Sequence, residues 1–329
     1  MIIDFHVHHY PPCYLEALQS PESGLEAYRR EDGRLVVRWL GGVVLTVPTP
    51  MPDTATRLGM MDDLGIETQV LSLSAPSVYF LQGRPGLDLA RQVNDDLAEF
   101  HRRHPRRFES LAALPMTDPN LTIAELDRAL DNLGMRGTMI LTTVAGVTLD
   151  DPRFETFWAH ANEVGLLVYV HPTVPASPGP ASDYALSLGV AYLNETAMAI
   201  ARLAFSGVFE RYPRIRWIFS HLGGTIPLVL DRLDSYYRQF PECREHINRP
   251  PSEYLKRIFY DTVSTHRPAL RCCQETVGIN QMVFGSDYPH IPAGSRPFLE
   301  ALDVLVASES ERADLLGDRA RRLLDGQAG

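Results

Sequence analysis

Two histidines one residue apart, His6 and His8, stand in an apolar run near the start of the sequence, "MIIDFHVHHYPP". Side chains alternate across a β-strand, so residues i and i+2 point to the same face. The pair can therefore present two ring nitrogens to one metal ion. The competing interpretation is a pair of buried structural histidines whose ring nitrogens have ordinary hydrogen-bond partners.

Three more ionisable residues end apolar runs later in the chain. His171 closes "LLVYVHP", His221 closes "WIFSHLGG" and Asp287 closes "MVFGSDYP". Imidazole nitrogens and a carboxylate oxygen suit a divalent transition metal, with zinc as the first expectation and manganese as the alternative. If the fold brings these residues to the His6–His8 pair, the sequence predicts a metal site.

The elements that must position these residues are short apolar strands that alternate with amphipathic helices. Eight strands are expected, at 2–8, 68–74, 108–115, 137–141, 166–172, 215–224, 258–264 and 281–289. This alternation predicts an α/β fold, a (β/α)8 TIM barrel with extra C-terminal helices, whose functional groups lie at the carboxyl ends of the strands. An open doubly wound sheet is the alternative, but no G-x-G-x-x-G follows the first strand.

One long insertion separates the first strand from its helix. Residues 9–53 contain "RLVVRWLGGVVLTV", two apolar runs around Gly41 and Gly42 that predict a β-hairpin. Insertions of this kind commonly cover a functional site, so we expect a lid over the barrel mouth. We find no linker or repeat and treat residues 1–329 as one domain.

Composition narrows the class of protein. Hydrophobic residues make up 45% of the 329 residues, as in a globular protein with a sizeable core, and the net charge of -10 argues against nucleic-acid binding. Four cysteines without a C-x-x-C pair indicate reduced thiols. A signal peptide and a membrane span are not expected, because neither apolar pattern is present. These features predict a cytoplasmic protein.

The ordered motifs resemble a known family. H-x-H on the first strand, histidines on the fifth and sixth and an aspartate on the eighth resemble the amidohydrolase superfamily. More narrowly, the chain is similar to the branch with aminocarboxymuconate-semialdehyde decarboxylase, in "IDFHVHHYPP", "GIETQVLSLSAP", "FSGVFERYP", "FSHLGGTIP", "PPSEYLKRIFYDT" and "MVFGSDYP". "APSVYF" is similar to 6-methylsalicylate decarboxylase-like members. The similarity runs from about residue 1 to 290.

The resemblance implies metal-dependent, non-oxidative decarboxylation of an aromatic, hydroxybenzoate-like, or unsaturated carboxylic acid. It implies His6, His8, His171 and Asp287 as metal ligands and His221 as the unligated acid/base. It also implies that Arg232 in "HLGGTIPLVLDR" reaches the substrate of a neighbouring subunit, and hence a homodimer or a higher homo-oligomer. The other interpretation of Arg232 is a solvated helix residue.

Some positions depart from the family pattern or extend it. A substrate-binding arginine of the aminocarboxymuconate enzyme would fall near Leu45, so that substrate is not expected. The only lysine is Lys256, which excludes a carboxylated lysine bridging two metals on the fourth strand. As substrate contacts we predict Tyr79 and Phe80, after the second strand, and His290, after the eighth; the alternatives are packing at the barrel rim for the two aromatic residues and a surface loop for His290.

Several reactions stay open on these residues. His221 or Asp287 could supply the proton that replaces the departing carboxyl group. The same metal could serve a hydrolase, such as a lactonase or amidase, or a hydratase. A non-catalytic metal- or ligand-binding barrel is the alternative outside enzymes, and the acid/base histidine beside a complete ligand set argues against it.

Overall fold

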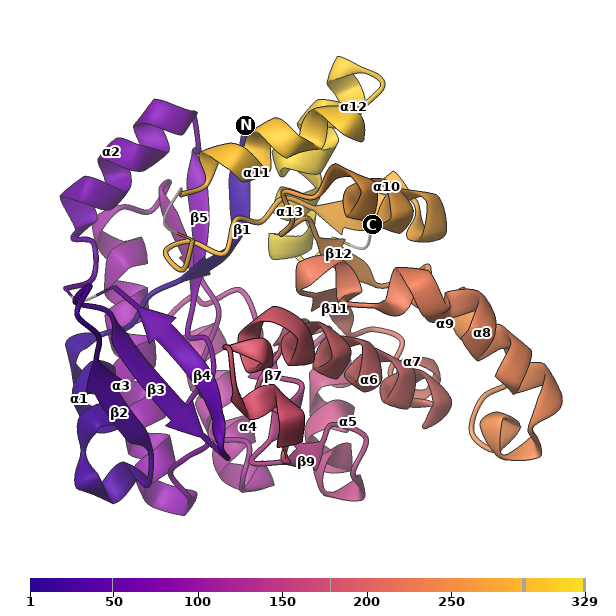
Figure 1. Ribbon diagram of the computed structural model, residues 1–329, viewed down its shortest axis with the longest axis horizontal. Helices are drawn as coiled ribbons and strands as arrows, with labels where there is room; N and C mark the ends of the chain where they lie inside the picture. Colours follow the sequence, from indigo (N-terminus) through magenta and orange to yellow (C-terminus); the bar gives the residue numbers. More distant parts are fainter. Residues whose placement is uncertain (49, 178, 292–293, 328–329) are drawn as a thin grey trace.

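The computed structural model describes residues 1–48, 50–177, 179–291 and 294–327 and is drawn in Figure 1. All eight expected strands are present and follow one another around a ring. They are β1 (Ile3–His8), β5 (Thr68–Ser72), β6 (Phe108–Ser110), β7 (Thr138–Leu141), β10 (Leu167–His171), β11 (Arg216–Phe219), β12 (Phe259–Asp261) and β13 (Met282–Val283).

The strands form two parallel sheets, in the orders β1-β5-β6 and β13-β12-β11-β10-β7. Two isolated bridges join the sheets into a closed ring. Val7 of β1 pairs with Tyr288 beyond β13, and Ala112 beyond β6 pairs with Thr138 of β7. The predicted (β/α)8 barrel is therefore confirmed, and all the carboxyl ends of its strands face one mouth.

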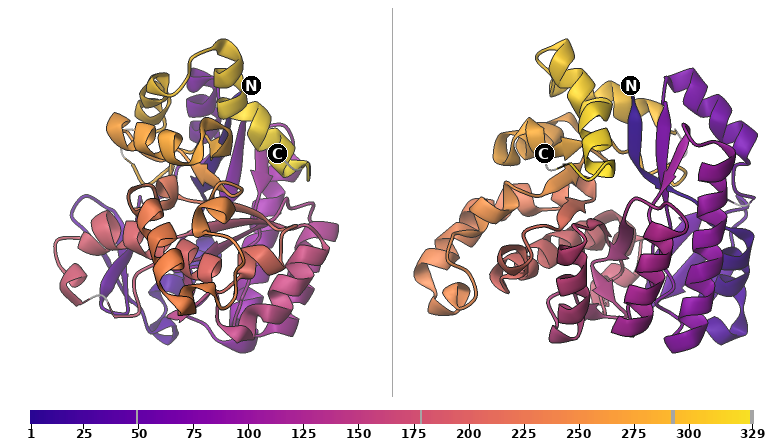
Figure 2. Two further views of the ribbon diagram at one scale, coloured as in Figure 1. Left: turned by 90° about the vertical axis from the view of Figure 1, so that its right-hand side faces the viewer. Right: turned by 180° about the vertical axis from the view of Figure 1, so that it is seen from behind.

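Helices cover the outside of the ring, as Figures 1 and 2 show. Side-chain caps fix where two of them begin. Asp53 and Asp118 accept hydrogen bonds from backbone N–H groups in the first turns, at 2.7 and 3.0 Å. The main outer helices are α2 (Thr54–Leu64), α3 (Gly83–Arg103), α4 (Pro119–Asp131), α5 (Glu155–Glu163), α6 (Tyr192–Phe205), α8 (Ile226–Gln239) and α10 (Arg267–Val277).

The helical region between β10 and β11 is interrupted. A π-helical turn (Ser187–Ala191) precedes α6, and Gly207, with φ 77°, separates α6 from α7 (Val208–Arg211). Glycine is the residue that adopts this left-handed backbone without steric cost, so the chain turns there.

Apolar side chains fill the barrel interior below the mouth, and the C-terminal helices close its opposite end. The interior cluster contains Phe5, Tyr169 and Ile218, and the last helix, α13 (Arg319–Leu324), adds Leu323 and its neighbours to it. The other predicted C-terminal helices are α11 (Arg296–Ala301) and α12 (Glu309–Ala313). Within the described residues, no helix combines the length and apolar character needed to span a bilayer.

The insertion after β1 folds as α1 (Pro12–Gln19) and a three-stranded antiparallel sheet of β2 (Glu26–Arg29), β3 (Leu35–Trp39) and β4 (Gly42–Val47). The predicted hairpin is β3–β4; β2 is largely exposed and lacks an apolar signal. Ser187 and Tyr192 donate side-chain hydrogen bonds to the carbonyls of Val43 and Val44, at 2.8 and 2.6 Å. These bonds hold β4 beside the start of α6 (Figure 1).

Candidate metal centre and active site

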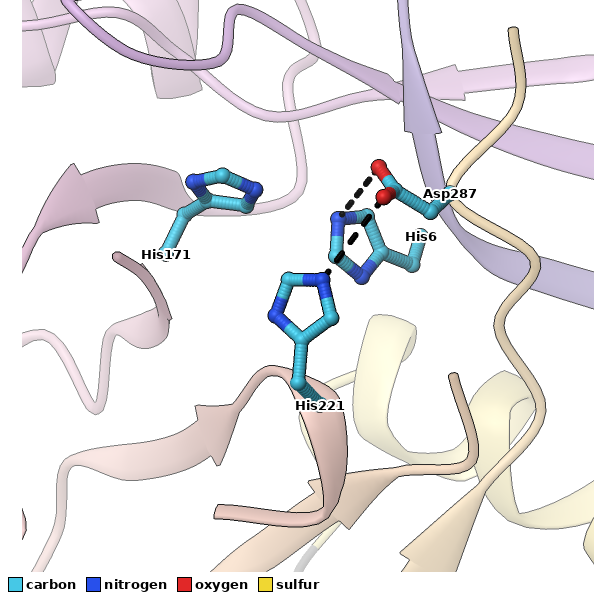
Figure 3. A group of neighbouring side chains, drawn as sticks. All are labelled: His6, His171, His221 and Asp287. Carbon is cyan, nitrogen blue, oxygen red and sulfur yellow. Dashed lines mark ion pairs between the residues drawn. The ribbon is translucent and has the colours of Figure 1, made fainter. Parts of the chain in front are cut away.

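Five ionisable side chains from distant parts of the chain meet at the barrel mouth. Potential ligand atoms of His6, His171, His221 and Asp287 all lie within 4.8 Å of one another (Figure 3). His8 lies next to this group, because its Nε2 is 2.9 Å from the Nε2 of His6. The residues at the ends of strands one, five, six and eight are thus brought together, as the sequence predicts.

Hydrogen bonds fix the proton positions on three of these histidines. The Nδ1 of His171 lies 2.8 Å from the carbonyl of Pro172, which can only accept a hydrogen bond. The Nδ1 of His6 lies 2.6 Å from the carboxylate of Asp261. Each Nδ1 therefore carries the proton, and each Nε2 presents a lone pair.

His8 reaches the same state through a hydroxyl group. Ser72 donates its hydroxyl proton to the carbonyl of Val7 at 3.0 Å, so its Oγ accepts from the Nδ1 of His8 at 3.2 Å. Burial also lowers the pKa of His8 to about 3. The neutral ring therefore turns an Nε2 lone pair toward His6.

The converging atoms are acceptors that require a positive partner. One oxygen of Asp287 lies 3.4 Å from the Nε2 of His6 and 3.2 Å from the Nε2 of His8. That oxygen is buried and has no hydrogen-bond donor among the described residues. Lone pairs held this close repel unless a cation lies between them, and three imidazoles with one carboxylate form a common ligand set for a divalent ion. The residues present therefore fit a divalent metal site.

Asp261, at the end of β12, holds the site together from behind. One of its oxygens accepts from His6 Nδ1, and the other accepts from the backbone N–H of His221 at 2.7 Å and of Val263 at 2.9 Å. Tyr169 donates its hydroxyl to the first oxygen. Burial would raise the pKa of Asp261, but its interactions with His6 and Tyr169 lower it. A carboxylate in this position fixes a ligand histidine by its outer nitrogen.

His221 differs from the other histidines in its electrostatics. Burial disfavours its charged form, but the adjacent negative charge of Asp287 outweighs this and raises its pKa. Its Nε2 lies 3.6 Å from an Asp287 oxygen, and its buried Nδ1 has no partner in the described part of the chain. His221 is therefore suited to hold and transfer a proton next to the ligand carboxylate.

The backbone is strained at both candidate catalytic residues. His221 and Asp287 have φ of 54° and 60°, in the left-handed region, which costs roughly 1–2 kcal/mol for a residue with a Cβ. Two bonds hold them there: His221 N–H to Asp261, and Asp287 N–H to the carbonyl of His6 at 2.8 Å. Strain supported in this way is typical of functional positions.

An irregularity in β1 directs both His6 and Phe5 inward. The pairing with β5 changes register between Asp4 and Val7. As a result the rings of Phe5 and His6 lie 5.9 and 5.3 Å from the ring of Tyr169. The crowding leaves no room behind His6: a Cβ on Gly285 would lie 2.7 Å from the Cβ of His6. The glycine of "GSDYP" is therefore required by close approach.

A cavity of about 750 Å³ opens above these side chains. Its volume is that of a typical small-molecule site. His171, His221 and Asp287 line its floor, and the insertion contributes part of the wall. Apolar side chains dominate the remainder, including Val44, Leu45, Leu188, Leu193, Val263 and Phe298.

The predicted substrate contacts are placed differently from one another. His290 lines the cavity, but both its nitrogens are engaged, Nδ1 with the carbonyl of Thr46 at 3.0 Å and Nε2 with the hydroxyl of Tyr10 at 2.7 Å. Tyr79 and Phe80 do not line the cavity. Tyr79 is fully buried in the core, and Phe80 packs on that core. The ring of Phe80 lies 6.3 Å from that of Tyr14 in α1.

Arg232 lies on the outer surface of α8, away from the cavity lining. Its guanidinium lies 4.9 Å above the ring of Tyr236 and donates to the hydroxyl of that residue. Figure 2 shows α8 projecting from one side of the barrel.

Sequence reasoning missed two residues with a place in the site. Asp261 ends the apolar run "IFYD", the same signal that marked His171 and His221, and could have been found by applying that rule to the seventh strand. Arg34 lines the cavity from the insertion and has no comparable signal, because only the packing of β3 and β4 against the barrel brings it there.

Comparisons with known proteins agree with this geometry. The family model described as Amidohydrolase matches residues 3–326. A 2-amino-3-carboxymuconate-6-semialdehyde decarboxylase from Dictyostelium discoideum is 29% identical over 83% of this chain and 76% of its own length. A gamma-resorcylate decarboxylase from Rhizobium radiobacter is 31% identical over 83% of this chain and 88% of its own.

A solved structure extends the similarity to three dimensions. The 5-carboxyvanillate decarboxylase LigW from Sphingomonas paucimobilis superposes with a TM-score of 0.84 at 26% identity, over 98% of each chain. The family match covers nearly every residue that builds the barrel and all five ionisable residues of its mouth. The chain belongs to the amidohydrolase family.

Proposed function

We infer that this protein is a metal-dependent carboxy-lyase that decarboxylates an aromatic, hydroxybenzoate-like acid without an oxidant. One observation supports this function above all. Acceptor atoms of the metal-site residues converge next to His221, at the floor of a cavity with apolar walls, and the buried Asp287 oxygen among them has no hydrogen-bond donor in the described part of the chain. The family relatives described above are decarboxylases by name, in agreement with the function predicted from sequence.

We assign the divalent ion to His6, His8, His171 and Asp287. His8 is chosen over His221 because its lone pair already faces His6 and Asp287, whereas His221 favours the protonated form. Zinc fits three imidazoles and one carboxylate best, and manganese is the alternative. The ion would hold the substrate's carboxylate and an adjacent hydroxyl oxygen and so orient the bond that breaks.

The protein's own groups supply the proton and the environment. Loss of CO2 requires a proton at the ring carbon that carried the carboxyl group, and His221 stands beside Asp287 with a proton to give. The apolar wall of Val44, Leu45 and Phe298 suits an aromatic ring and excludes water from the floor. The insertion 9–53, which provides Val44 and Leu45, acts as the predicted lid.

The test is a product assay on metal-loaded protein with a panel of hydroxybenzoates and lactones. Release of CO2 from the acids supports the decarboxylase, whereas acid release from lactones identifies the hydrolase. Tight metal binding without turnover of any compound would identify the protein as a non-catalytic metal-binding barrel. Asp287→Asn should abolish turnover, and retained activity in His221→Asn would remove His221 as the proton donor.

We propose a homodimer or higher homo-oligomer in which Arg232 enters the neighbouring subunit's site. Leu228, one turn before Arg232 on α8, is 76% exposed, and Met198 of the neighbouring α6 is 57% exposed. Exposed apolar groups of this size mark interaction surfaces.

Mixing inactive subunits tests this assembly. If Arg232 acts across the interface, Arg232→Ala and Asp287→Asn subunits are each inactive alone but regain activity when mixed. If Arg232 acts in its own subunit, or has no role, mixing restores nothing beyond the separate proteins.

All four cysteines are free thiols, which supports the proposed cytoplasmic location.

A further inference from the structure

Arg34 contributes a charged side chain to the wall of the cavity. It precedes β3 in the insertion, is half-buried, and lines the same cavity as His171, His221 and Asp287. Its guanidinium donates to the carbonyl of Thr46 at 3.3 Å and to the carbonyl of His290 at 3.1 Å. Two carbonyls from different elements therefore hold this cation in a fixed position.

The charge of Arg34 is not balanced by an acid. Within the described residues it makes no ion pair with a carboxylate; Asp32, the nearest acid in sequence, binds its backbone N–H at 3.1 Å instead. Asp32 and Arg30 line the cavity as well, but they pair with each other, carboxylate to guanidinium at 3.6 Å. Carbonyl oxygens satisfy two donor directions of Arg34 but cancel none of its charge. Such a cation attracts an anionic group of the ligand.

A single residue, His290, connects Arg34 to the metal centre. The His290 whose carbonyl it binds has its ring 5.2 Å from the ring of His8. A ligand held at the floor by one carboxylate can therefore present a second group to Arg34 from the same cavity.

We propose that Arg34 makes the enzyme selective for aromatic acids that carry a second carboxylate, which Arg34 binds while the first is removed at the metal centre. The inference rests on the proposed function and names its substrate class. The planar guanidinium matches a carboxylate with two parallel hydrogen bonds, so the second acid group also sets the orientation of the ring. An uncharged ring substituent would leave the cation unpaired.

The experiment compares a diacid with a monoacid of the same core, 4-hydroxyisophthalate and salicylate, in wild type and Arg34→Gln. The glutamine amide can still donate to the carbonyls of Thr46 and His290, so the variant loses the charge while it keeps a donor. We expect kcat/KM for the diacid to fall roughly tenfold to a hundredfold, with that for salicylate little changed. Arg34→Lys should recover part of the loss.

Binding without turnover is the second measurement. Calorimetry with isophthalate and benzoate on the metal-loaded protein should give tighter binding of isophthalate, lost in Arg34→Gln. The matched control is Arg38→Gln, the same change on β3 at a residue that binds the carbonyl of Gly41 and does not line this cavity.

The outcomes separate the two proposals. Equal loss for diacid and monoacid, or unchanged selectivity in Arg34→Gln, overturns the role of Arg34 and leaves the decarboxylase intact. Absence of CO2 release from either acid in wild type overturns the proposed function, while the binding preference for isophthalate still reports on Arg34.

Discussion

The carboxylate of Asp261 controls which nitrogen of His6 faces the metal centre, and Asp261→Asn isolates this role. One oxygen of Asp261 accepts two backbone N–H groups, from His221 and Val263, and the other accepts from His6 Nδ1 and Tyr169. An asparagine keeps its oxygen toward the two backbone donors, because the reverse orientation would oppose them with its NH2. The NH2 then faces His6 Nδ1, where two donors conflict.

The histidine resolves this conflict by changing tautomer. Nδ1 becomes the acceptor, and the proton moves to Nε2, the atom that faces His8 at 2.9 Å and Asp287 at 3.4 Å. A protonated Nε2 cannot ligate. Loss of an outer partner of this kind typically weakens metal affinity about 10–100-fold, which corresponds to about 1.4–2.7 kcal/mol. The fold should persist, because both backbone bonds are retained.

The assay is metal content at equilibrium in a series of zinc buffers, measured by mass spectrometry on wild type and variant. Tyr169→Phe is the matched control: it removes the other donor to the same oxygen and leaves the tautomer of His6 unchanged, so its metal affinity should stay near wild type. Equal affinity in Asp261→Asn and wild type would refute the tautomer argument. Equal loss in both variants would point to general disturbance of the site.

Three further predictions concern packing, acid and capping. Gly285→Ala places a Cβ 2.7 Å from that of His6, so overpacking should cost roughly 1–3 kcal/mol of unfolding free energy and weaken metal binding; an unchanged Tm and metal affinity would contradict it. Burial lowers the pKa of His8 to about 3 and that of His171 well below its usual value. Below pH 6.5 the unfolded chain therefore binds protons that the folded chain excludes. As the pH is lowered, urea unfolding of metal-free protein should show the unfolding free energy decreasing by about 1.4 kcal/mol per pH unit for each histidine. An unfolding free energy that does not change with pH would reject this. Asp118→Ala should lower the unfolding free energy by about 1 kcal/mol, measured by denaturant unfolding, with no change in metal content.

The barrel could be predicted because its signals are local and repeated. Each strand is an apolar run of a few residues, and Asp118 before Pro119 marks a helix start on its own. The carboxyl ends of these runs place His171, His221 and Asp287 at one mouth without any knowledge of tertiary contacts. This is why the ionisable residues that meet at the mouth were predictable one by one.

The rest of the site depends on contacts between distant segments. Arg34 reaches the cavity only because Thr46 and His290, from two other elements, supply carbonyls to it. Tyr79 was expected in the cavity from its place after a strand, but the chain turns and buries it in the core. The register shift in β1, between Asp4 and Val7, leaves no mark in the spacing of the histidines.

The contact between the first and last strands has a consequence for how the protein matures. The backbone N–H of Asp287 donates to the carbonyl of His6, and the ring closes where Val7 meets Tyr288. A nascent chain carries its first two histidines from the earliest moments of synthesis, yet the group of ionisable side chains at the mouth is incomplete until Asp287 has left the ribosome. Chains that end before residue 287 therefore lack the carboxylate of the proposed ligand set.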